Sequence, residues 1–441
     1  DDLTLHRGGK CPQEVALRAV LTQLGLKDVE DVYEMDGIGW HGCDVQEIEL
    51  DGREEVQGTL DERIAELPKL SWLDLSDTRV IGDVKALENN RKLDRLLLQR
   101  TDVTGDLRSL SQARLTYLDL GNTQVTGDLS NLSQATCLTD LYLQNTRVTG
   151  NISMLRNWSH LQTADLSRTN VSGRLDGSWR GHCQRLRDLN LAETKVTLDP
   201  NYDDKWFSCL GLGGHPDLDH CFLPKLATLD LSACPLNSAA ADFLEALRTS
   251  PSLATLKAAN AGLSGGISTK DVQQVQAVAV DLSSNKLTHI GALPPNCRSF
   301  TAASNYGNLT FGKGVLGKAI SAGVSLDLWN VTFDPTESAR LLDRKLLTPT
   351  ERRVVYNEDR GFACYDVLPT NFRISPELFA PERLCSCLPG WNGSGATCQQ
   401  CPKNTFKDSF EGTCQHCPEG SQAAPGAKSL TQCRCKIGEV F

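Results

Sequence analysis

The sequence lacks a run of about 18 consecutive apolar residues, the length that a membrane-spanning helix requires. Its first residues, DDLTLHRGGKCPQEV, also lack the basic and then apolar pattern of a secretory signal peptide. If the protein is exported, we expect that its signal has already been removed. Positive charges are outnumbered too, since 45 Lys and Arg residues face 55 Asp and Glu residues, for a formal net charge of -10. Such a chain repels phosphate backbones and anionic lipid surfaces at long range, so nucleic acid is not an expected partner.

A catalytic constellation is also missing from the sequence. Catalysis needs a nucleophile, a base and an orienting group that converge in one pocket. The 8 histidines are scattered, with only His215 and His220 close together. The GLGG run at 211–214 does not join a strand to a helix as phosphate-binding loops do. We therefore expect no enzymatic activity, no cofactor and no metal site.

Cysteine, by contrast, is abundant. The chain has 17, and nine of them lie between Cys364 and Cys435. This density in a short segment is typical of disulfides that replace an apolar core, which indicates an oxidising compartment. We expect a secreted protein or a cell-surface ectodomain. Because 17 is odd, at least one thiol is free or bonded outside this chain, and Cys137, Cys234, Cys297 and Cys435 are the candidates.

Asn-x-Ser/Thr sequons give a second, weaker indication of a secretory route. The alternative is that they are ordinary loop residues without sugar, since several arise by chance. The predicted glycosylation sites are Asn131, Asn151, Asn157, Asn170, Asn308, Asn330 and Asn392.

An LxxLxL pattern recurs every 22 or 23 residues through the first half of the chain. The copies read LSWLDLSDTRVIGDV from Leu70, LDRLLLQRTDVTGDL from Leu93, LTYLDLGNTQVTGDL from Leu115, LTDLYLQNTRVTGNI from Leu138 and LQTADLSRTNVSGRL from Leu161. Looser copies begin at Leu186, Leu226, Leu253, Ala277 and Cys297, and VQEIEL from Val45 is the opening copy. One copy cannot bury its apolar edge alone, so the copies are expected to stack into a solenoid with one parallel sheet.

Within each copy, leucines such as Leu73 and Leu75 alternate inward on a short strand, and valines such as Val80 return the chain to the same core. A glycine follows at one offset, where a tight turn needs a permissive backbone. The glycines are Gly82, Gly105, Gly127, Gly150 and Gly173.

These motifs resemble leucine-rich repeats, and the VTGDL and VSGRL continuations are similar to the plant-type subclass. The resemblance covers residues 45–335 and implies an α/β solenoid, a curved parallel β-sheet of leucine-rich repeats with capped ends. The family usually places Asn where the strand turns. We read this column as Thr78, Thr101, Thr123, Thr146, Thr169, Thr194, Cys234, Asn260, Asn285 and Asn305. Threonine reaches less far than asparagine, so we expect an intact fold with altered fine curvature.

Residues 1–44 are predicted to cap the first repeat. CPQEVALRAVLTQLGL, at 11–26, has Pro12 at a helix start. Its expected core face consists of Val15, Leu17, Val20, Leu21 and Leu24. The segment GWHGCDVQEIELDG is similar to the cysteine-containing N-terminal caps of plant-type repeat proteins, which implies a disulfide between Cys11 and Cys43.

An insertion at 198–225 interrupts the repeats, and Cys209 and Cys221 could form a disulfide within it. Long loops in compact folds are often functional, and the alternative is that this insertion is a surface loop without a function. Residues 336–384 are expected to form a C-terminal cap.

Residues 385–441 are predicted to form a small cysteine-rich module. Two CxxC pairs, Cys398/Cys401 and Cys414/Cys417, have almost the spacing of a zinc ribbon. A zinc ribbon would use only these four cysteines and would leave the other cysteines of the segment without a role. We favour disulfides. The segment resembles the cysteine-rich modules, related to EGF repeats, of ephrin-type receptor ectodomains, on a pattern of Cys387, Cys398, Cys401, Cys414, Cys417 and Cys433. Cys364 and Cys385 complete the cysteines that we expect to be bonded.

Outward strand positions on the concave sheet form the candidate binding site. Trp and Tyr beside Arg are enriched at binding hot spots, whereas Asp in the LDLS phrase is common in this family for other reasons. The predicted partner-binding residues are Trp72, Arg95, Tyr117, Asp119, Asp140 and Tyr142. We expect a recognition or adhesion module for a protein, peptide or glycan. The alternative is a structural subunit of an extracellular filament, coat or matrix assembly, and a zinc-dependent tail is a weaker third hypothesis.

Overall fold

The computed structural model describes residues 11–27, 29–179, 181–198, 223–247, 250–305, 309–328, 353–367, 372–373, 385–394, 397–410 and 412–435. The chain divides into two compact units. The first consists of Asp1–Asn237 and Thr249–Leu253, and the second of Ser238–Arg248 and Ala254–Phe441.

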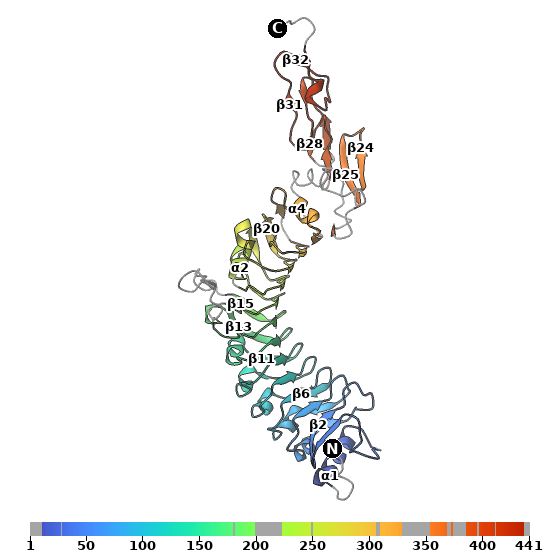
Figure 1. The fold of residues 1–441 in the computed structure, drawn as a ribbon, viewed down its shortest axis with the longest axis vertical. Coiled ribbons are helices and arrows are strands. Elements are labelled where there is room, and N and C mark those ends of the chain that lie inside the picture. The colour runs from blue at the N-terminus through green and yellow to red at the C-terminus, as the bar shows by residue number, and fades with distance from the viewer. Residues whose placement is uncertain are drawn as a thin grey trace. The chain divides into compact units, whose positions relative to one another are not determined.

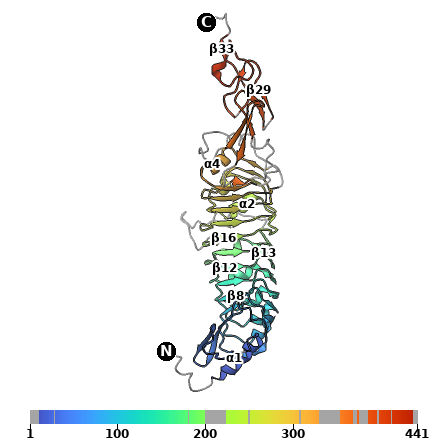
Figure 2. The same cartoon turned by 90° about the vertical axis from the view of Figure 1, so that its right-hand side faces the viewer.

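Short strands, one from each repeat, form the main sheet of the first unit. Each strand pairs in parallel with the strand of the next repeat, so equivalent residues of successive repeats are direct neighbours. The strands are β2 (Asp44–Glu49), β4 (Trp72–Asp74), β6 (Arg95–Leu97), β8 (Tyr117–Asp119), β10 (Asp140–Tyr142), β12 (Thr163–Asp165), β14 (Asp188–Asn190) and β16 (Thr228–Asp230). Figure 2 labels β8, β12 and β16, which come from every second repeat of this sheet. β1 (Ile38–His41) pairs antiparallel with β2.

The return half of each repeat forms short 3-10 helices and two further parallel sheets. One sheet holds β3 (Thr59–Leu60), β5 (Ile81–Asp83) and β7 (Asp102–Thr104); the other holds β9 (Thr126–Asp128), β11 (Arg147–Asn151), β13 (Asn170–Leu175) and β15 (Lys195–Leu198). The helices include η3 (Val84–Leu87), η4 (Leu107–Leu110), η5 (Leu129–Leu132) and η6 (Ile152–Asn157). Asp83, Asp106, Asp128 and Asn151 cap them by accepting the backbone N–H two residues later.

The predicted turn glycines have the expected conformation, with φ between +112° and +127°. At Gly82 a Cβ atom would also come within 2.4 Å of the Leu60 carbonyl oxygen. The inward leucines of the repeat pattern and the valines of the return are fully buried, as the repeat pattern predicts. Trp158 and Trp179 are fully buried as well.

Six buried threonines, from Thr78 to Thr194, make up most of the turn column of the first unit, and Cys234 continues it. Each hydroxyl donates to the carbonyl oxygen three residues earlier in its own repeat, at 2.6 to 2.7 Å. The alignment of Asn260 with this column is wrong. In each repeat one residue has a positive φ, and the column residue comes directly after it. In this repeat the residue with positive φ is Asn260, at +52°. The buried column residue of this repeat is therefore Ala261.

The N-terminal cap contains α1 (Pro12–Gln23), with Pro at the first helical position. Leu17, Val20, Leu21 and Leu24 are buried as predicted, and the Cys11–Cys43 disulfide is present. The placement of Val15 on the core face is wrong, because this side chain is 71% exposed. Two residues along a helix turn the side chain by roughly 200°, so Val15 and Leu17 lie on opposite sides.

The second unit repeats the architecture with strands β17 (Thr255–Lys257), β19 (Ala279–Asp281), β21 (Ser299–Thr301), β23 (Ser325–Asp327) and β26 (Phe372–Arg373) in one parallel sheet. A second parallel sheet holds β18 (Ser264–Ile267), β20 (Lys286–Ile290) and β22 (Thr310–Phe311). Its helices are α2 (Ala240–Leu247), α3 (Thr269–Val272) and α4 (Val315–Ser321).

The remaining strands of the second unit are antiparallel. β24 (Arg353–Asn357), β25 (Phe362–Val367) and β27 (Cys385–Cys387) form one sheet. Three hairpins follow, made of β28 (Trp391–Ser394) with β29 (Thr397–Gln400), β30 (Thr405–Phe406) with β31 (Gln415–His416), and β32 (Ser421–Gln422) with β33 (Arg434–Cys435). These strands are orange to red in Figure 1.

Disulfides confirm the prediction for the cysteine-rich module. The bonds join Cys387 to Cys398, Cys401 to Cys414 and Cys417 to Cys433. All four sulfurs that a zinc ribbon would need are therefore bonded. Among the described residues of the module, the apolar cluster consists of Phe406, Ala423 and Ala427, with Cys417 and Cys433 packed against it. Its resemblance to ephrin-type receptor modules stays a prediction.

The other cysteines have different environments. Cys137 is free and exposed, whereas Cys183, Cys234 and Cys297 are free and buried. Cys183 was not among the candidates from the sequence. Cys364 lies opposite Cys385 in the register of β25 and β27, but their side chains, like that of Cys435, lie outside the described part of the chain. Cys209 and Cys221, and with them most of the 198–225 insertion, also lie outside it.

Candidate functional site

Side chains that point outward from the main sheet of the first unit form two columns, which we call the sheet face. The register aligns Trp72, Arg95, Tyr117 and Asp140 in one column, followed by Thr163. The neighbouring column reads Asp74, Leu97, Asp119, Tyr142 and Asp165. The strand pairing thus brings together all six residues predicted to bind a partner.

Four of these residues pack into a continuous stack across β4, β6, β8 and β10, which we call the aromatic ladder. The guanidinium carbon of Arg95 lies 4.2 Å from the ring centroid of Trp72 and 5.4 Å from that of Tyr117. The ring centroids of Tyr117 and Tyr142 are 5.7 Å apart. Each side chain is half-buried. The ladder therefore presents a packed surface of π faces and one cation, held by cation–π and aromatic contacts.

Burial dominates the electrostatics of the ladder. It raises the pKa of Tyr117 to about 12, and Tyr142, Asp119 and Asp140 add to this rise while Arg95 opposes it. Burial also raises the pKa of Tyr142. Trp72 Nε1 and Arg95 Nε are buried and have no hydrogen-bond partner among the described residues. These two donors are not used in holding the ladder together.

The aspartates of the sheet face have a structural task. Asp74, Asp119, Asp165 and Asp230 each accept, through Oδ1, the backbone N–H two residues later, at 2.9 to 3.0 Å. This bond closes the turn after each of these four aspartates. Burial raises the pKa of Asp119 to about 6, since the side chain is only 8% exposed. The recurrence of Asp in the LDLS phrase follows from this turn and does not require a ligand.

Acidic side chains continue the sheet face toward the N-terminal cap. Glu47 and Glu49 of β2 align with Trp72 and Asp74 of β4. Burial raises the pKa of Glu49, and the nearby charges of Glu47, Asp74 and Asp51 raise it further. The aromatic ladder thus lies beside carboxylates on the same sheet.

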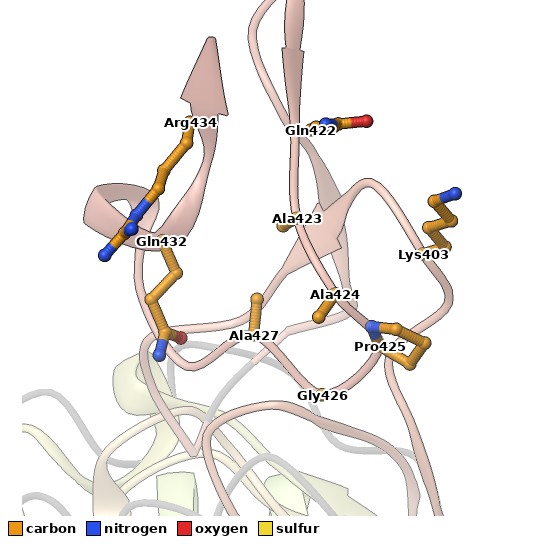
Figure 3. A pocket seen from close by; sticks show the side chains of 9 residues that line it. All are labelled: Lys403, Gln422, Ala423, Ala424, Pro425, Gly426, Ala427, Gln432 and Arg434. Atoms are coloured by element: carbon orange, nitrogen blue, oxygen red, sulfur yellow. The ribbon is translucent and has the colours of Figure 1, made fainter. Parts of the chain in front are cut away.

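Two open cavities are found elsewhere. One, of about 610 Å³, lies in the first unit and is lined mainly by cations and amides. No motif or repeat column predicts it. The other, of about 560 Å³, lies in the cysteine-rich module. Figure 3 shows Arg434 and Gln432 on one side of it and Lys403 on the other, with alanines between them. Among the described residues, no three His, Cys, Asp or Glu side chains form a group that could hold a metal ion.

The described sequons lie away from the main-sheet strands. Asn131 is in η5, Asn151 and Asn157 are at the ends of η6, and Asn170 begins β13. Asn392 is exposed in β28. Asn308 and Asn330 lie outside the described residues. None of the described sequons would place a sugar on a strand of the sheet face. No helix of the described part is long and apolar enough to cross a membrane.

Comparisons with known proteins agree with the repeat architecture. No protein-family model matches the sequence, and no curated protein matches it. The receptor kinase HAESA from Arabidopsis, solved with the peptide hormone IDA and a co-receptor, is 18% identical with a TM-score of 0.55, over 73% of this chain and 54% of that one. A plant ice-binding protein is 20% identical with a TM-score of 0.50, over 66% of this chain and 91% of that one.

A third solved structure, the plant peptide hormone receptor RGFR1 with RGF2, is 22% identical with a TM-score of 0.46, over 62% of this chain and 46% of that one. The chain thus spans about half the length of the two receptor chains. At these identities, the likeness shows the fold alone. The chain has the fold of a leucine-rich-repeat solenoid followed by a small disulfide-rich module.

Proposed function

We propose that the chain is a non-catalytic extracellular recognition or adhesion module that binds a protein or peptide partner through the sheet face. The aromatic ladder carries this proposal. Tryptophan, tyrosine and arginine are enriched at binding hot spots, and side chains that are already packed lose little freedom when a partner arrives. Trp72 Nε1 and Arg95 Nε are donors that a polar group of the partner can satisfy after a small side-chain shift. The peptide hormone in the HAESA structure supports a peptide as the partner class.

A displayed library of random peptides, selected on the purified chain, tests this function. We expect the double variant Tyr117→Ala/Tyr142→Ala to weaken binding of the selected peptides at least about tenfold, which corresponds to roughly 1.4 kcal/mol. Its melting temperature should change little compared with the loss of binding, because both side chains are half-buried on the sheet surface and lie outside the leucine core of the solenoid.

The matched control for this experiment is Ile81→Ala/Arg147→Ala, which changes exposed residues of β5 and β11. It should bind the selected peptides like the wild type. Unaltered binding by the tyrosine variant would show that partners use another surface.

An extracellular location is part of the proposal, and the disulfides and exposed sequons support it. Non-reducing peptide mapping of native material should recover the four described disulfides and should also link Cys364 to Cys385 and Cys209 to Cys221. Glycopeptide analysis should find sugar on Asn151 and Asn157, which are exposed. Unmodified asparagines at both positions would remove this support for a secretory route.

A structural role in an extracellular assembly is the second candidate. One observation favours it: Cys137 is free and exposed, and such a thiol can link two chains in an oxidising compartment. Non-reducing electrophoresis of native material should then show a dimer that Cys137→Ser abolishes. A monomer in both proteins would reject this form of assembly.

A further inference from the structure

The cavity of about 610 Å³ in the first unit lies where three successive repeats enter their main-sheet strands. We call it the edge pocket. The turn before β6 contributes Arg91 and Lys92, the turn before β8 contributes Gln112 and Arg114, and the turn before β10 contributes Gln134, Thr136 and Cys137. All seven residues are exposed.

The charge of the edge pocket is opposite to that of the rest of the chain. Arg91, Lys92 and Arg114 line it together with amides and a hydroxyl, and no carboxylate is among the lining residues. None of the three cations forms an ion pair within the part of the chain that the structure describes. Three neighbouring positive charges repel one another, so a bound anion would relieve this repulsion. The chain as a whole has a net charge of -10, so this cluster is a local exception.

We propose that the edge pocket binds an anionic oligosaccharide through carboxylate or sulfate groups. Arginine guanidinium groups pair with such oxyanions through two parallel hydrogen bonds. Successive repeats are spaced by roughly 4.8 Å at their strands, so the turns offer donors at regular intervals along a linear polymer. Gln112, Gln134 and Thr136 can bond the sugar hydroxyls between the charged groups.

An oligosaccharide fits the pocket better than a nucleic acid does. The acidic chain repels a long polyanion at a distance, whereas a short anionic oligosaccharide needs only the local cluster. The cavity of about 610 Å³ falls within the range of about 300–1,000 Å³ that is typical of pockets for drug-sized ligands. This site is separate from the sheet face, so its test does not depend on the proposed peptide partner.

Titration calorimetry with three hexasaccharides tests the proposal. The probes are an oligogalacturonate, which carries carboxylates, a heparin-derived hexasaccharide, which also carries sulfates, and neutral maltohexaose. We expect at least one charged probe to bind and maltohexaose not to bind. A preference for the first or the second charged probe distinguishes carboxylate from sulfate recognition. Failure of both charged probes to bind would overturn the proposal.

Charge-matched variants separate a specific site from general attraction. Arg91→Gln/Arg114→Gln should weaken binding of the charged probe at least tenfold. Lys85→Gln/Arg147→Gln removes the same charge from exposed positions outside the pocket and should change the affinity less than twofold. An equal loss in both variants would mean non-specific electrostatic attraction and would reject the site.

Cys137 provides a local readout that needs no substitution. Iodoacetamide should alkylate this exposed thiol, whereas burial raises the pKa of Cys183, Cys234 and Cys297 and keeps them unreactive. A saturating charged probe should slow alkylation of Cys137 at least threefold, as measured by peptide mapping, and maltohexaose should not. Unchanged alkylation with bound probe would place the binding site elsewhere and contradict the proposal.

Discussion

The two units close the turn after each main-sheet strand in different ways. In the first unit, Thr123 and its equivalents donate one hydrogen bond to a carbonyl of their own repeat. In the second unit, the Asn285 side chain bonds two repeats: Oδ1 accepts from the N–H groups of Ala261 and Leu263, and Nδ2 donates to the carbonyls of Ala258 and Leu282. At the same position, a threonine of the first unit is therefore a local brace, whereas Asn285 of the second unit is a link between repeats.

This difference shows what side-chain length does in a stacked fold. Asparagine has both donors and an acceptor, and it reaches the neighbouring repeat, whereas the threonine hydroxyl reaches only its own turn. In the column of the first unit, only the Cys234 side chain donates to the preceding repeat among the described bonds, at the Leu191 carbonyl oxygen. Other inter-repeat side-chain bonds of this unit lie outside the column. Thr104, Thr126 and Thr149 donate across its second sheets to glycine carbonyls of the preceding repeat, at 3.0 to 3.1 Å. These bonds lie nearer the surface than those of Asn285, which is buried.

The largest expected effect comes from removing the inter-repeat link. Asn285→Ala leaves the N–H groups of Ala261 and Leu263 without the acceptor that now serves both, in fully buried residues. A buried donor without a partner costs about 1–3 kcal/mol, so we expect a loss of about 3–5 kcal/mol in the free energy of unfolding of the second unit. Urea denaturation followed by hydrogen exchange should locate the loss there. A loss below about 1 kcal/mol would show that the link is unimportant.

The second effect tests whether turns in the first unit need a charged residue. Burial raises the pKa of Asp119 to about 6, so the folded state holds its proton more tightly than the unfolded chain does. The stability from this group is present below about pH 4 and is lost as the pH rises through about 6. With roughly 1.4 kcal/mol for each pKa unit, ionised Asp119 destabilises the fold at neutral pH by up to about 3 kcal/mol.

Asp119→Asn should therefore raise the free energy of unfolding at pH 7.5 by about 1–3 kcal/mol and leave it nearly unchanged at pH 4. Asparagine can keep the turn, because Asn190 already accepts the N–H of Ala192 at the equivalent position. Urea denaturation across this pH range measures the effect. Asp102→Asn, on an exposed residue of β7, is the charge-matched control and should show no such pH dependence. Equal curves for the two variants would reject a special role for Asp119.

Much of this arrangement could be predicted from the sequence, because the repeats fix it. The alternation of leucines predicts the positions of the strands, and the glycine column predicts the positions of the turns. The phase of the repeats predicts that Trp72, Tyr117 and Tyr142 lie on one face of the sheet. The Asn260 error is one of phase. In the other copies the column residue lies eight positions after the first residue of the copy, as Thr123 does after Leu115, and the same offset from Leu253 gives Ala261. The positive φ of Asn260 and the burial of Ala261 agree with this offset.

Other features had no periodic signal. The position of Arg95 between two aromatic rings depends on side-chain conformations on adjacent strands, and an alignment of the repeat sequences does not specify these conformations. The edge pocket combines residues at different offsets in three turns, so no single column reveals it. The position of Arg95 and the edge pocket therefore depend on the three-dimensional stacking of the repeats.

The smallest effect is expected at the local brace of the first unit. The Thr123 hydroxyl is buried and donates to the carbonyl oxygen of Leu120 at 2.6 Å. Thr123→Val keeps the volume and the β-branched shape and removes this one bond. The net value of such a bond is about 0.5–1.5 kcal/mol, so the variant should lose about 1 kcal/mol in the free energy of unfolding of the first unit.

The control variant Thr123→Ser keeps the hydroxyl and removes only a methyl group, and the loss of this group costs about as much free energy of unfolding as the loss of the bond. The two variants separate in urea denaturation combined with hydrogen exchange, since only Thr123→Val should affect the protection of the turn itself. If Thr123→Val instead lost as much as Asn285→Ala, the threonine column would hold successive repeats together as strongly as the asparagines do, and the contrast between the two units would not stand.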